Sequence, residues 1–62
     1  MTDAQIIKSA YADALNKLFT VFFDALVTSG GNAQADAVAA NHFKHGIALA
    51  RVARDRALKF VK

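Results

Sequence analysis

Residues 28–33 of this 62-residue chain read TSGGNA, and they contain the only strong break in a sequence without proline. Gly30 and Gly31 stand next to each other, and glycine readily takes the left-handed conformation that follows the end of a helix. Asn32 is a residue type that caps the start of the next helix. We therefore predict a tight turn over residues 29–32.

Long segments rich in alanine, leucine, lysine, arginine and aspartate flank this turn on both sides. We expect a first helix over about 2–28, capped by Thr2 or Asp3, and a second helix over about 33–60. Helices of equal length joined by a short turn run antiparallel and lie side by side. The predicted fold class is therefore all-α, a two-helix antiparallel hairpin that forms one domain over 1–62.

The hairpin carries more apolar residues than one small domain can easily bury. Hydrophobic residues make up 55% of the chain, and residues 18–27 (LFTVFFDALV) hold three of its five phenylalanines. A chain of this length buries only ~60% of its unfolded surface and usually needs a disulfide, a metal or an oligomer. Because there is no cysteine, we expect homodimerisation into a four-helix bundle.

Helical spacing of ~100° per residue places large apolar side chains on one broad face of the first helix and small ones on the second. Gly46 costs ~1 kcal/mol relative to alanine inside a helix, and a close approach of the two helices would compensate; simple tolerance of the glycine is the alternative. The expected core and dimer residues are Ile7, Tyr11, Leu15, Leu18, Phe19, Phe22, Leu26, Ala39, Phe43, Gly46, Leu49, Ala50, Ala53, Ala57 and Phe60.

Phe23 and Val27 lie beyond this apolar face, close to the polar side of the first helix. Apolar residues that a core does not use often mark a partner site. We therefore predict that Phe23 and Val27 bind another protein.

Positive charge is concentrated in the second half of the chain. Residues 1–28 hold two lysines and three aspartates, a net charge of −1, whereas residues 33–62 hold six basic residues and two aspartates, a net charge of +4. Such a basic helix can contact phosphates or be merely solvated. No aromatic residue alternates with these basic residues, so we do not expect a base-stacking platform. The candidate nucleic-acid contacts are Lys44, Arg51, Arg54, Lys59 and Lys62.

Catalytic, metal and cofactor sites are not expected. Ser9 and Ser29 have no matching histidine and carboxylate, and no glycine-rich phosphate loop is present. His42 and His45 are two candidate metal ligands, but a zinc site needs three or four. A site shared across a dimer axis remains the alternative, and otherwise we predict a non-enzymatic protein without cofactors.

The chain shows no membrane or export signal. Its longest apolar run has ten residues with Thr20 and Asp24 inside it, whereas a spanning helix needs ~20. The N-terminus has no basic segment ahead of an apolar run, as a signal peptide would. With the absence of cysteine, these features favour a cytoplasmic protein.

A 62-residue hairpin with its turn at 30–32, Gln34-Ala35-Asp36 at the start of the second helix and then His42 resembles the Rop (Rom) plasmid copy-number regulators. The resemblance implies a dimeric antiparallel four-helix bundle. That family binds an RNA loop–loop complex through its paired first helices. The corresponding positions here include Ala10, Ala14, Leu18 and Ala25, so the resemblance covers the architecture and not the RNA-binding residues.

Three functional hypotheses follow. The first is a small regulatory, adaptor or inhibitor protein that homodimerises and binds a protein partner, of the size that phages and mobile elements often make. The second is a Rop-like regulator that binds RNA or DNA through the basic face of its second helix. The third is a membrane-surface peptide, which Asp13 and Asp24 disfavour because surface-active helices carry lysine and arginine on the polar face.

Overall fold

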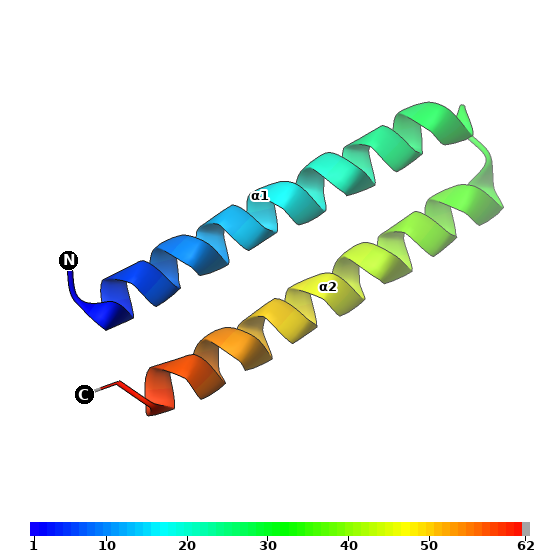
Figure 1. Ribbon diagram of the computed structural model, residues 1–62. Helices are drawn as coiled ribbons and strands as arrows, with labels where there is room; N and C mark the ends of the chain where they lie inside the picture. Colours follow the sequence, from blue (N-terminus) through cyan, green and yellow to red (C-terminus); the bar gives the residue numbers. More distant parts are fainter. Residues whose placement is uncertain (62) are drawn as a thin grey trace.

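The computed structural model describes residues 1–61, which form two antiparallel α-helices joined by residues 30–32 (Figure 1). Helix α1 spans Asp3–Ser29 and helix α2 spans Ala33–Lys59. No strand is present among the described residues. The predicted all-α hairpin is therefore confirmed, and Ser29, which we expected in the turn, is the last residue of α1.

A capping box starts α1. The Thr2 hydroxyl oxygen accepts a hydrogen bond from the Gln5 backbone N–H at 3.1 Å, and the Gln5 side-chain oxygen accepts one from the Thr2 N–H at 2.8 Å. These bonds satisfy two donors that have no partner inside the helix. Of the two capping residues expected from the sequence, Thr2 is therefore the cap.

The turn has the geometry that its sequence predicts. Gly30 and Gly31 have φ angles of 59° and 91°, which residues with a side chain rarely adopt. The Asn32 side chain accepts a hydrogen bond from the Ala35 backbone N–H at 2.9 Å and caps α2. The Ser29 hydroxyl lies against Asp36 in the first turn of α2, so a side-chain contact joins the helices at this end.

Three contacts set the register of the helices along the rest of the hairpin. The Phe22 and Phe43 rings stack with centroids 4.8 Å apart, and the Arg54 guanidinium lies over the Tyr11 ring, 4.4 Å from its centroid. Between these pairs, a Cβ built on Gly46 would lie 2.6 Å from Leu18 Cδ2. Leu18 therefore packs onto the backbone of α2 because Gly46 has no side chain.

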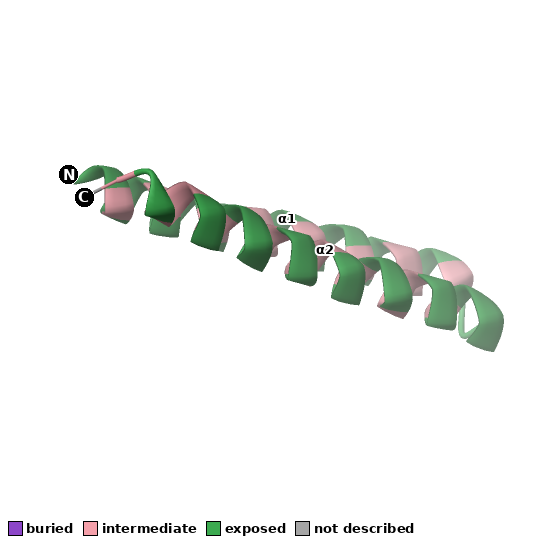
Figure 2. Cartoon of the chain, turned by 90° about the horizontal axis from the view of Figure 1, so that it is seen from below, coloured by how far each residue is buried: buried purple, intermediate pink, exposed green. Residues whose placement is uncertain are grey.

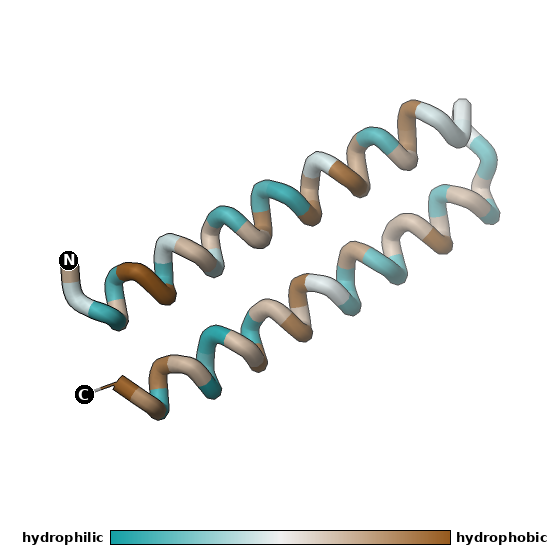
Figure 3. The backbone as a smooth tube through the Cα atoms, viewed as in Figure 1, coloured by the Kyte–Doolittle hydropathy of each residue, from teal (hydrophilic) through white to brown (hydrophobic). Residues whose placement is uncertain are grey.

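The hairpin is a single layer with no interior (Figures 2 and 3). The Cα trace has principal dimensions of 47 × 18 × 6 Å, its two helices lie in one layer, and none of the described residues is buried. The chain exposes 4895 Å², whereas a compact monomer of 6.7 kDa exposes about 3,900 Å². The hairpin thus exposes about 1,000 Å² more than a compact globule of its mass would.

Substitutions at Gly46 test the close approach of the helices. Gly46→Leu is expected to lower the free energy of unfolding by ~1–3 kcal/mol, because the new side chain cannot share the space with Leu18. Gly46→Ala should be close to neutral, since the ~1 kcal/mol gain in helix propensity offsets the displacement of Leu18.

Urea denaturation at one fixed protein concentration measures both effects. Ala48→Leu, on the exposed outer side of the same helix, is the matched control and should change stability little. If Gly46→Leu were as stable as the Ala48→Leu control, the contact with Leu18 would not matter.

Candidate protein-binding surface

The hairpin has two broad faces with different surfaces. On one face, three hollows follow one another from the open end of the hairpin to the turn, and we call it the grooved face. By helical spacing, the opposite face carries larger side chains, and we call it the aromatic face. The large apolar residues of the aromatic face are Leu15, Phe19, Phe23, Leu26, Ile47 and Leu58.

A row of exposed apolar side chains runs along α1 on the aromatic face. Phe19 and Phe23 stack with ring centroids 6.3 Å apart, and Val27 extends the row by one turn, at the border with the outer side of α1. The three residues are 57%, 54% and 65% exposed. The predicted partner residues Phe23 and Val27 thus lie at the surface, and they adjoin Phe19, which we had assigned to the core.

Basic residues of α2 lie on the same face as this row. Lys44 and Arg51 are exposed, and they are three and four residues from Ile47, whose side chain lies on the aromatic face. Lys8 of α1 occupies the same helical position as Leu26, because eighteen residues make five full turns. No aromatic residue alternates with the basic residues along α2, but Phe19 and Phe23 of α1 lie by helical spacing on the same face of the hairpin.

The other predicted nucleic-acid contacts lie elsewhere. Lys59 is exposed and lies by helical spacing on the outer side of α2, away from Lys44 and Arg51. Lys62 lies outside the described residues. Arg54 contacts Tyr11 and forms an ion pair with Asp55, with 3.0 Å between Arg54 Nε and the carboxylate, so it already has two partners within the hairpin.

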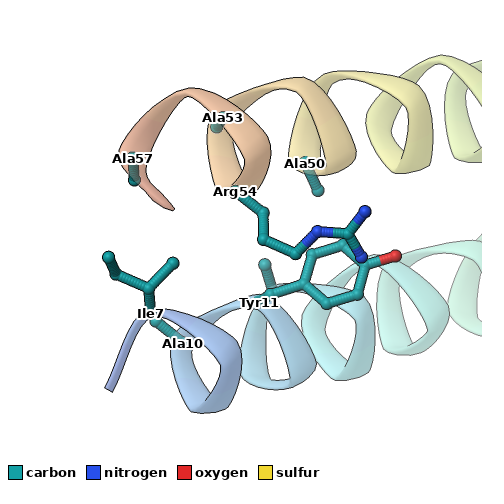
Figure 4. A pocket seen from close by; sticks show the side chains of 8 residues that line it. Ile7, Ala10, Tyr11, Ala50, Ala53, Arg54 and Ala57 are labelled. Atoms are coloured by element: carbon teal, nitrogen blue, oxygen red, sulfur yellow. The ribbon is translucent and has the colours of Figure 1, made fainter. Parts of the chain in front are cut away.

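Arg54 and Tyr11 border the hollow at the open end of the hairpin (Figure 4). The hydrogen bond to Asp55 raises the pKa of the Arg54 guanidinium above its usual value. Arg54 therefore carries its charge at any working pH and covers the Tyr11 ring as a cation.

The hollows of the grooved face are lined mostly by small residues. The first has a volume of about 280 Å³ and is lined by Ile7, Ala10, Tyr11, Ala14, Ala50, Ala53, Arg54 and Ala57. The second, about 80 Å³, is lined by Leu18, Val21, Phe22, Ala25, Ala39, His42 and Phe43. The third, about 430 Å³ and shallower, is lined by Asp24, Ala25, Thr28, Ser29, Ala35, Val38, Ala39 and His42.

The residues expected in the core divide into two groups. Eleven are half-buried between the helices: Ile7, Tyr11, Leu15, Leu18, Phe22, Leu26, Ala39, Phe43, Gly46, Ala50 and Ala57. Phe19, Leu49, Ala53 and Phe60 are exposed in the single chain.

Sequence reasoning missed three half-buried apolar residues of α2. Ala40, Ile47 and Leu58 are half-buried and continue the spacing of Phe43 and Ala50 at intervals of three and four residues. That spacing was the available signal. The face of α2 that we predicted to form the core was displaced toward the grooved face. The displacement arose because the side chains on the inner side of α2 and those on the grooved face are both apolar.

His42 and His45 are both exposed. Residues 1–61 contain no group of three or more histidine, cysteine, aspartate or glutamate side chains placed to hold a metal ion. Within the same residues, neither helix combines the length and apolar character that crossing a bilayer requires.

No protein-family model, curated protein or solved structure matches this chain. The comparisons therefore give no support for a relationship to the Rop regulators, and the likeness is limited to the helical hairpin.

Two phenylalanine substitutions test which side chains stabilise the contact between the helices and which belong only to the aromatic face. Phe22→Ala removes the stack on Phe43 and should destabilise the protein by at least about 1 kcal/mol, though by less than the ~3–5 kcal/mol of a fully buried phenylalanine. Phe19→Ala, three residues away and 57% exposed, should change stability much less. Thermal unfolding followed by circular dichroism compares the two, and equal losses would show that Phe19 belongs to the folded core.

Proposed function

We propose that this protein is a small non-enzymatic regulatory or adaptor protein that homodimerises and binds a protein partner through its aromatic face. The observation that carries the proposal is the exposed row of Phe19, Phe23 and Val27. Contiguous apolar side chains of this size on a small protein mark interaction sites. Aromatic residues supply much of the binding free energy at protein interfaces, because they bury a large area at low entropic cost.

The charges beside this row indicate the chemistry of the partner. Lys8, Lys44 and Arg51 place cations on the aromatic face, and its one acidic neighbour, Asp55, is paired with Arg54. An exposed apolar row with cations beside it fits an amphipathic helix that carries aspartate or glutamate beside its apolar stripe. Opposite charges would steer the encounter, and the phenylalanines would hold the complex.

Affinity capture with quantitative mass spectrometry tests this proposal. Phe23→Ser should lose the partner while the protein stays helical, because Phe23 is 54% exposed. Val52→Ser is the matched control, since Val52 is 45% exposed and lies by helical spacing on the outer side of α2. The proposal fails if Phe23→Ser and Val52→Ser capture the same proteins in the same amounts as the parent.

Nucleic-acid binding is the second candidate, because Lys44 and Arg51 share a face with two phenylalanines. Surfaces that bind single-stranded nucleic acid combine two components. Cations contact the phosphate backbone, and neighbouring aromatic rings stack on the bases. Salt dependence separates the two candidates. Binding to RNA or DNA should weaken steeply with salt, with a slope of ~0.7–0.9 per neutralised phosphate, whereas apolar burial is not screened.

Charge reversal completes the comparison. Lys44→Glu with Arg51→Glu should abolish nucleic-acid binding in a gel shift, whereas it should weaken a protein complex only in part. Tight RNA or DNA binding at physiological salt that is lost in the charge-reversed variant would favour the nucleic-acid function over the protein-binding one.

A further inference from the structure

We infer that the grooved face binds a second copy of this chain, stacked antiparallel so that the turn of each hairpin lies over the open end of the other. This inference rests on the proposed homodimer and adds to it which face is buried and in which orientation. Three observations support it: the exposed area, the distribution of charge between the faces, and the positions of the hollows relative to the protruding side chains.

The area of the hairpin fits an interface with one further chain. The chain exposes about 1,000 Å² more than a compact protein of its mass. A stable protein–protein interface buries about 800 Å² on each partner. One face covered by one second copy is therefore enough to bring the exposed area to the value of a compact protein.

Charge selects the grooved face over the aromatic face. Stacking the aromatic face on its own copy would bring Lys8, Lys44 and Arg51 of both chains together, and like charges in one interface oppose association. The residues that line the three hollows include one cation, Arg54, and one anion, Asp24. Lys17, three residues from Ala14 and four from Val21, adds a second cation to the grooved face by helical spacing. The grooved face thus carries fewer cations than the aromatic face, and its own copy meets less like-charge repulsion there.

The charges of Asp24 and Arg54 favour the antiparallel orientation. Asp24 is eight residues from the middle of α1 toward the turn, and Arg54 is eight residues from the middle of α2 toward the open end. Turning the second copy end for end keeps the two copies of Asp24 at opposite ends of the interface, and it places Arg54 of the second copy, which is also paired with Asp55 of its own chain, at the level of Asp24. Stacking turn on turn would instead gather both copies of Asp24 at one end.

Shape gives a third and independent reason. The hollow of about 280 Å³ lies near the open end. In the antiparallel orientation, Val21 and Val38 of the second copy lie at the same position along the helix axes as this hollow. These side chains are 68% and 54% exposed, and each borders a hollow of its own chain on the grooved face. They would fill the hollow of the other copy.

The opposite end of the interface matches in the same way. The shallow hollow of about 430 Å³ lies near the turn, where the antiparallel second copy brings Ile6 and Phe60. These side chains are 51% and 87% exposed. In the turn-on-turn orientation each hollow would face the same hollow of the second chain. The interface would then enclose empty space, which lowers stability.

Ala53→Arg tests the choice of face. Ala53 is exposed and lines the first hollow, so an arginine there should weaken the dimer at least about tenfold in sedimentation equilibrium, the range for buried charges in an interface. Ala48→Arg, on the outer side of α2, has the same helix propensity and should leave the dimer unchanged. A dimer insensitive to Ala53→Arg would overturn the inference while leaving the proposed homodimer intact.

Spin-label distances test the orientation. The chain has no cysteine, so Gln34→Cys introduces a single label at an exposed site beside the turn. Gln34 is twelve residues from the middle of α2, so antiparallel stacking predicts a separation of at least about 35 Å at 1.5 Å per residue. A separation below about 25 Å would show that the turns lie together and would contradict the antiparallel inference.

Discussion

A layer of two helices has no interior, and the other features of this protein depend on that constraint. Each helix can turn only part of its circumference toward the other, and both carry apolar residues over a wider arc than one contact covers. The result is a hairpin in which every described residue keeps some exposure. A second layer is the general way in which helical proteins bury such faces.

The close approach at Leu18 and Gly46 shapes the surface as well as the hairpin. Because Gly46 of α2 has no side chain, Leu18 of α1 fills the space between the helices at this point. The alanines that flank this contact leave the hollows of the grooved face, whereas Leu15, Leu26, Ile47 and Leu58 fill the aromatic face. The two faces of the hairpin therefore differ in relief and in charge, and we assign them different partners.

Much of the fold follows from a few residues of the sequence. Gly30 and Gly31 end α1, and Thr2 and Asn32 cap the two helices, because each of these effects is local and depends on the chemistry of one or two side chains. Residues that share a surface without sharing a helix were harder to predict. Phe19 and Lys44 lie on the same face of the hairpin only because α1 packs on α2, and a pattern along one helix does not contain that packing.

The central claim is that one hairpin is incomplete and associates with a second copy. Sedimentation equilibrium of the unmodified protein at micromolar concentration tests it most directly, because the mass of the chain is 6.7 kDa. The account predicts a particle of twice that mass whose thermal stability rises with protein concentration. A well-folded particle of 6.7 kDa, with a melting temperature independent of concentration, would contradict it.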